Sequence, residues 1–174
     1  MPKLNIRKAT EQDASKIIRF LKKIYSENLD TLFKKDSVPS ILKEEYYIRQ
    51  IYRYNGVIFI AEILNVVVGM ITARRYEQPQ VAHSVLIGIS VLKDFRNRGI
   101  GKKLMDTIKL WAKENKVKRI ELQVFSINLK ALEFYLREGF DTECIKQGAV
   151  LIKGGYYDII QMVYPLDERI LWTI

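Results

Sequence analysis

RNRGIG (residues 96–101) stands between two segments of opposite character. The preceding run, His83 to Leu92, is rich in β-branched and other apolar residues and predicts a central strand. The following stretch repeats apolar residues at helical spacing, at Ile100, Leu104, Ile108 and Trp111. This spacing predicts an amphipathic helix, and residues 119–125 predict the next strand. Residues 83–125 are therefore expected to form a strand–helix–strand unit.

A strand that ends in a glycine-containing turn and opens directly into a helix is a place where phosphate groups bind. The first helical turn has free amide groups and lies at the positive end of the helix dipole. Gly99 and Gly101 would let a ligand approach the backbone closely. The segment matches neither the Walker loop nor the dinucleotide-binding pattern, and two glycines are also compatible with a simple helix start.

The charge of the chain is concentrated around the same turn. Residues 93–119 hold ten lysines and arginines but three acids, which gives this segment +7 of the total net charge of +9. Such a patch favours a polyanionic partner: nucleic acid, a phosphate-rich cofactor or an acidic membrane surface. A solvated helix face is the simpler alternative.

The bulk of the sequence indicates one globular domain over residues 1–174. Its hydrophobic content of 48% is enough for a core, and no apolar run reaches the length of a membrane span. The N-terminus lacks the apolar region of a secretory signal, and the single Cys144 cannot form an internal disulfide. We therefore expect a cytoplasmic protein without a membrane partner and without a metal site.

A second motif lies after the 119–125 strand. Asn128, Ala131 and Tyr135 share one face of a predicted helix that ends near Gly139. This face would let a ligand lie against the helix beside the small Ala131, while Asn128 could also be a plain N-cap. Another set of side chains on this helix is expected to serve the core, namely Leu129, Leu132 and Leu136.

RNRGIG resembles the R/Q-x-x-G-x-G/A motif of the GNAT superfamily of N-acetyltransferases, and residues 128–140 resemble that family's N-x-x-A-x-x-x-Y-x-x-x-G-F segment. The resemblance implies the GNAT acyl-CoA N-acyltransferase fold, of the α/β class. This fold has a central, mixed, mostly antiparallel twisted sheet of about seven strands flanked by about four helices. The predicted order, β-α-α-β-β-β-α-β-α-β-β, agrees with it.

The resemblance also implies an activity, which is the transfer of acetyl from acetyl-coenzyme A to a primary amine by direct attack in a ternary complex. Tyr135 would be the general acid that protonates the departing thiolate, and a backbone amide near the end of the 83–92 strand would face the acetyl carbonyl. The implied cofactor-binding residues are Ile89, Ser90, Val91, Arg96, Asn97, Arg98, Gly99, Ile100, Gly101, Lys102, Asn128, Ala131 and Tyr135.

The general base is not evident. Many family members place Glu or His eleven residues before the first residue of the motif, where this chain has Val85. His83 lies two residues earlier, and therefore on the same face of the predicted strand. Glu121 on the next strand is a second candidate, and proton loss to solvent is a third option.

The acceptor is the least determined part. In this family the first two helices and the last strand pair shape its pocket, and here these segments carry aromatic residues, namely Tyr25, Phe33, Tyr46, Tyr47, Tyr156 and Tyr157. Among these, Tyr25, Tyr156 and Tyr157 are the expected substrate-binding residues. Tyr156-Tyr157 resembles protein N-terminal acetyltransferases, which favours a peptide α-amine. An α-amine, with a pKa of about 7.7–8.0, is also neutral more often than a lysine at about 10.4. A lysine or a small amine remains an alternative acceptor.

Two other functions are compatible with the sequence. The basic segment 93–119 could belong to a non-catalytic protein that binds nucleic acid, although no nucleic-acid-binding motif accompanies it. A regulator that senses coenzyme A on the same fold is the second alternative.

Overall fold

The computed structural model describes residues 3–27, 30–31 and 37–170. They form one sheet of seven strands in the spatial order β1-β2-β3-β4-β5-β7-β6. The strands are β1 (Leu4–Lys8), β2 (Val57–Ile63), β3 (Val66–Arg75), β4 (Ser84–Val91), β5 (Arg119–Phe125), β6 (Asp141–Ile152) and β7 (Gly155–Pro165). Neighbouring strands are antiparallel except β4 and β5.

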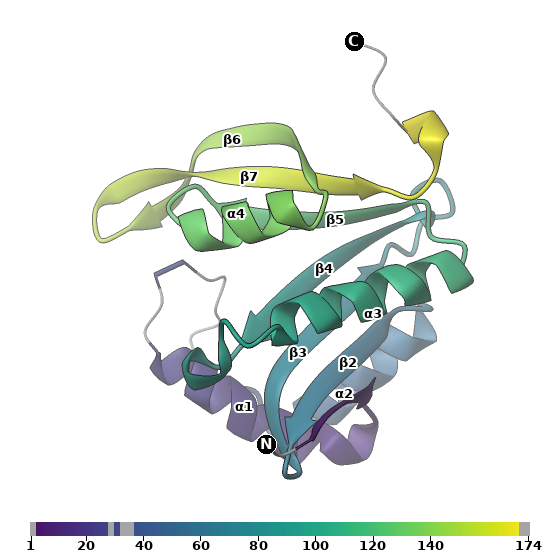
Figure 1. The fold of residues 1–174 in the computed structure, drawn as a ribbon, viewed down its shortest axis with the longest axis vertical. Coiled ribbons are helices and arrows are strands. Elements are labelled where there is room, and N and C mark those ends of the chain that lie inside the picture. The colour runs from purple at the N-terminus through teal and green to yellow at the C-terminus, as the bar shows by residue number, and fades with distance from the viewer. Residues whose placement is uncertain (1–2, 28–29, 32–36, 171–174) are drawn as a thin grey trace.

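The α-helices of the described residues are α1 (Ala14–Ser26), α2 (Ile41–Arg53), α3 (Ile100–Glu114) and α4 (Leu129–Arg137). Short 3₁₀ turns occupy Glu11–Asp13, Lys93–Phe95 and Glu168–Ile170. Figure 1 shows α3 and α4 on one face of the sheet and α1 and α2 on the other. The order of elements and the α/β class expected from the sequence are confirmed. None of the described helices is both long enough and apolar enough to cross a membrane.

The two faces of β3 have different neighbours. A Cβ atom on Gly69 would lie 3.1 Å from Leu104, so this residue faces α3. Because side chains alternate along a strand, Met70, Thr72 and Arg74 point to the opposite face, where α2 lies. Arg74 pairs with Leu86 of β4, so Leu86, Gly88 and Ser90 lie on the same face of the sheet as Arg74.

The divergence of β4 and β5 is the feature that creates a site. These strands pair in parallel over Ser84↔Arg119, Val85↔Ile120 and Leu86↔Glu121. Beyond Leu86, β4 continues to Val91 beside β3 alone, while β5 continues beside β7. Among the described residues, the backbone of 87–91 therefore lacks a strand partner on its β5 side.

The helices follow the predicted apolar patterns with one exception. The stripe of α3 is buried at Ile100, Leu104, Ile108 and Trp111, which confirms the prediction. On α4, however, Leu129 is 66% exposed and Leu136 is 56% exposed, so the expectation that both serve the core was wrong. This short helix buries only a narrow face, centred on Tyr135.

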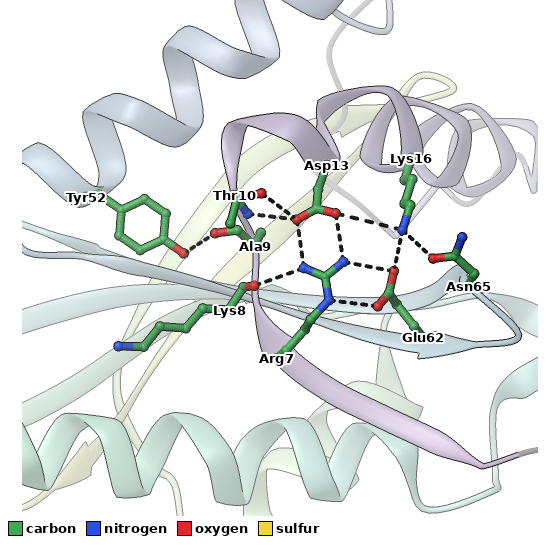
Figure 2. Close-up of polar contacts among 9 residues, drawn as sticks. All are labelled: Arg7, Lys8, Ala9, Thr10, Asp13, Lys16, Tyr52, Glu62 and Asn65. Carbon is green, nitrogen blue, oxygen red and sulfur yellow. Dashed lines mark hydrogen bonds and ion pairs between the residues drawn. The ribbon is translucent and has the colours of Figure 1, made fainter.

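A cluster of four charged side chains attaches the N-terminal segment to the sheet (Figure 2). The guanidinium of Arg7 on β1 donates to both carboxylate oxygens of Asp13, at 2.7 and 2.8 Å, and its Nε donates to Glu62 of β2 at 2.9 Å. Lys16 of α1 donates to the other oxygen of Glu62 at 3.1 Å. Asp13 and Glu62 are buried, and each carboxylate is paired, as a buried charge requires.

Candidate active site

A cavity of about 340 Å³ lies where β4 and β5 diverge. It connects the α2 face of the sheet with α4. From the α2 face it is lined by Thr31, Tyr47, Met70, Thr72, Arg74, Leu86, Gly88, Ser90 and Gln123. The remaining lining residues are Ile87, Ile89, Val124, Phe125, Asn128 and Tyr135. We call this space the central cavity.

The unpaired edge of β4 borders the central cavity. Of the three β4 residues expected to contact the cofactor, Ile89 and Ser90 line this cavity and Val91 does not. The carbonyl of Val91 accepts a hydrogen bond from Nε of Arg96 at 2.8 Å. The amides of β4 that face β5 have no strand partner among the described residues, and such donors could stabilise an oxyanion that develops beside them.

The turn at residues 96–102 has the geometry of an anion site. Asn97 and Gly99 have positive φ values of 58° and 74°, and α3 begins directly after Gly99. A Cβ atom on Gly99 would meet nothing within 4 Å, so a ligand could approach the backbone there. Amides 100–102 precede the first backbone bond of the helix, which Lys103 donates to Gly99 at 3.0 Å. These free N–H groups and the dipole favour a phosphate.

The basic side chains around this turn are partly engaged within the protein. Arg96 forms an ion pair with Glu27, next to the end of α1. Lys102 pairs with Asp106 at 3.0 Å, and Arg98 lies over the ring of Phe95 at 5.4 Å. The free backbone amides remain available to an anion here, and Arg96 joins the turn to β4 and to Glu27 after α1.

Tyr135 is buried, with 9% of its surface exposed, and it lines the central cavity. Its ring packs between Phe134 and Phe140, at centroid distances of 5.5 and 5.9 Å. Burial raises the pKa of Tyr135 from 10.0 to about 12, because the charged phenolate is poorly solvated there. The hydroxyl of Tyr135 is therefore protonated at neutral pH, as a proton donor must be.

Asn128 is the N-cap of α4 and also lines the central cavity. Its side-chain oxygen accepts a hydrogen bond from the amide of Ala131 at 3.3 Å, and its Nδ2 donates to the carbonyl of Thr31 at 3.5 Å. Ala131 itself is half-buried and is not among the lining residues. The cap thus holds the start of α4 against the cavity.

The two candidate bases lie elsewhere. His83 precedes the first residue of β4 and is exposed, because the strand begins one residue later than predicted. Together with Glu121 it lines a second cavity of about 290 Å³, whose other walls are Tyr76, Val81, Ser84 and Arg119. The carboxylate of Glu121 accepts hydrogen bonds from Arg119 at 2.8 Å and Tyr76 at 3.0 Å. Neither candidate lines the central cavity with Tyr135.

The acceptor side also differs from expectation. Of the aromatic residues proposed for it, Tyr47 lines the central cavity, whereas Tyr25, Tyr156 and Tyr157 do not. Tyr156 is 74% exposed on the β6–β7 hairpin, and Phe33 lies outside the described residues. Thr72 and Arg74 were missed, although the alternation along residues 66–74 would have placed both on one strand face.

Known proteins resemble this chain in sequence and in fold. The model of the acetyltransferase (GNAT) family matches residues 20–140. The L-amino acid N-acetyltransferase AaaT of Escherichia coli K12 is 34% identical over 97 residues, which are 55% of this chain and 60% of that protein. The matched segment thus spans less than two thirds of that relative.

Solved structures share the fold over nearly the whole chain. A GNAT-family acetyltransferase from Streptococcus pneumoniae superposes with a TM-score of 0.87 at 22% identity, over 94% of this chain and 99% of that one. The yncA protein of Salmonella typhimurium, solved with its cofactor acetyl-CoA, gives a TM-score of 0.85 at 16% identity, over 95% of both chains.

Proposed function

The chain belongs to the acetyltransferase (GNAT) family, and on that basis we propose that it transfers acetyl from acetyl-coenzyme A to a primary amine in a ternary complex. The observation that carries this proposal is that the buried Tyr135 lines the same cavity as the unpaired edge of β4. A proton donor and a row of free amides around one space suit acyl transfer.

The residues of this chain fit the donor. Amides 100–102 at the start of α3 and the open side of Gly99 would hold its pyrophosphate, and Asn128 would lie along its pantetheine arm. Bound there, acetyl-coenzyme A supplies an acetyl group activated as a thioester. The β4 amides would polarise the acetyl carbonyl, and Tyr135 would give its proton to the sulfur as the carbon–sulfur bond breaks.

The acceptor amine loses a proton as its bond to the acetyl carbon forms. The described lining of the central cavity contains neither a carboxylate nor a histidine. Water is therefore the proposed proton acceptor, and the neutral fraction of the amine limits the rate. The bases considered from the sequence, His83 and Glu121, lie at the second cavity and take no part in this proposal.

The cavity favours a small acceptor over a peptide. One of the two grounds for preferring peptide N-termini was the pair Tyr156 and Tyr157, which are not lining residues. The other ground, the lower pKa of an α-amine, applies equally to free amino acids and some small amines. A volume of about 340 Å³ is close to the lower end of ligand pockets, at about 300 Å³, and it must also receive the acetyl group. The partly matched E. coli relative is named for L-amino acids.

The basic segment gives less support to nucleic-acid binding than its composition suggested. Five of its ten cations form ion pairs with acids of the same chain, namely Arg96, Lys102, Lys109, Lys118 and Arg119. These cations are already partly neutralised, which weakens a phosphate-binding surface. A regulator that only senses coenzyme A differs from the proposed enzyme by showing no turnover.

The test is thiol release from acetyl-coenzyme A with free amino acids, N-terminal peptides, lysine peptides and polyamines as acceptors. Tyr135→Phe is expected to lower kcat by about 10²–10⁴-fold with little change in cofactor affinity, because it removes a proton donor and keeps the ring. Tyr54→Phe, which removes a hydroxyl outside the cavity, is the matched control. Wild-type turnover in Tyr135→Phe would reduce Tyr135 to a packing role.

A further inference from the structure

The described lining of the central cavity carries positive charge and no negative charge. Among its described lining residues Arg74 is the only charged side chain, and no acid accompanies it. Building on the proposed function, we infer that the acceptor bears a carboxylate close to its amine and that Arg74 binds this carboxylate. The substrate class is thus small free amino acids rather than polyamines, lysine side chains or peptide N-termini.

Arg74 is available for a ligand. It lies near the end of β3, on the face shared with α2, and none of the ion pairs formed by described residues includes it. Its charge acts on its surroundings nonetheless: burial raises the pKa of Tyr47, whereas the nearby Arg74 lowers it. Two arginines of other strands are held by carboxylates, Arg7 by Asp13 and Arg119 by Glu143. An arginine kept without such a partner beside a cavity can accept a carboxylate from outside.

The spacing suits a small amino acid. Arg74 pairs with Leu86, at the point where β4 and β5 separate, and Gly88 at the cavity wall lies two residues further along β4. Two residues of a strand span about 7 Å. A guanidinium on a flexible side chain can therefore reach a carboxylate whose amine lies beside residues 88–90, whereas the distant carboxylate of a longer peptide would be misplaced.

The same charge helps an active site whose described lining residues include neither a carboxylate nor a histidine. A carboxylate raises the pKa of an adjacent amine because it stabilises the ammonium form. When Arg74 pairs with the carboxylate, this stabilisation is offset, and the cation itself disfavours a second positive charge nearby. The bound amine is then neutral more often than in solution. The arrangement would repel a polyamine, whose additional ammonium groups meet no acid among the described lining residues.

The experiment compares L-leucine with L-leucinamide, which has the same side chain and amine but no carboxylate. The aliphatic side chain suits the apolar wall at Met70 and Leu86. We expect kcat/KM for leucine to exceed that for leucinamide at least tenfold, even though the amide has the more readily deprotonated amine. Leucyl-glycine, whose carboxylate is one residue further away, should resemble the amide.

Variants then assign the preference to Arg74. Arg74→Gln should raise the KM for leucine by roughly 10- to 100-fold and affect leucinamide much less, since only leucine has the carboxylate that contacts Arg74. Arg74→Lys should keep part of the preference. Arg53→Gln removes the same charge from an exposed position on α2 outside the cavity and should behave as wild type.

Three outcomes would overturn the inference. Equal kcat/KM for leucine and leucinamide in the wild-type protein would do so without any variant. Equal losses for both substrates in a folded Arg74→Gln protein would show that Arg74 supports the site rather than recognising the carboxylate. Binding of acetyl-coenzyme A without turnover on any amine would instead refute the proposed function, and the inference with it.

Discussion

Replacing Asp13 by asparagine tests the charged cluster that holds β1, α1 and β2 together. The Arg7 guanidinium, through its hydrogen bonds, lowers the pKa of Asp13 from 3.8 to about 2, against the opposing effect of burial. Each tenfold change in a protonation equilibrium corresponds to about 1.4 kcal/mol, so the charged carboxylate contributes roughly 2–3 kcal/mol to folding at neutral pH. The asparagine side chain resembles the neutral carboxyl group, and its single oxygen cannot accept from Arg7 at both positions.

Because the folded-state pKa is depressed, this stability is present above about pH 4 and is lost as the pH falls towards about 2. Urea unfolding should show Asp13→Asn destabilised by roughly 2–3 kcal/mol at neutral pH and by about half as much near pH 3. Glu11→Gln is the matched control, because it breaks an exposed pair with Arg49 outside the cluster and should change stability little. A loss for Asp13→Asn as small as that of Glu11→Gln, or one independent of pH, would refute the reasoning.

Three further outcomes are expected. Gly101→Glu should weaken binding of acetyl-coenzyme A, measured by calorimetry, because it adds a carboxylate at the start of α3; unchanged affinity would contradict the phosphate site. His83→Ala should keep its kcat/KM, since His83 is exposed at the second cavity; a loss of at least about tenfold in a folded variant would identify it as the base after all. Leu136→Lys should leave the melting temperature almost unchanged, whereas Leu132→Lys, at a partly buried position of the same helix, should lower it.

Local patterns in the sequence were enough for the order of elements and for the turn at residues 96–101. The α3 stripe and the Gly99 turn depend on neighbours within a few residues, so periodicity and turn chemistry predict them. Leu129 and Leu136 show the limit of that reasoning. Both satisfy a helical pattern, but how wide a face α4 buries depends on the strands beneath it, which the helix sequence does not describe.

The acceptor wall could not be predicted in the same way. Arg74 reaches the central cavity because it pairs with Leu86 at the point where β4 leaves β5, and this register joins segments that are distant in sequence. The position of His83 also depends on a strand end, because β4 begins at Ser84 and His83 lines the second cavity instead of the central one. Strand ends and long-range pairing are the least local properties of a sheet.

The short parallel pairing between β4 and β5 also affects how parts of the sheet unfold. Within the described part of the chain, three residue pairs are the only strand pairing that links β1–β4 to β5–β7, so the sheet is built from two halves with a weak seam. Units joined in this way can unfold separately from the rest. Native-state hydrogen exchange should therefore resolve two groups of amides, β1–β4 and β5–β7, each of which opens cooperatively. A ligand that contacts both halves of the sheet should slow amide exchange in both groups, because its binding stabilises the contact between them.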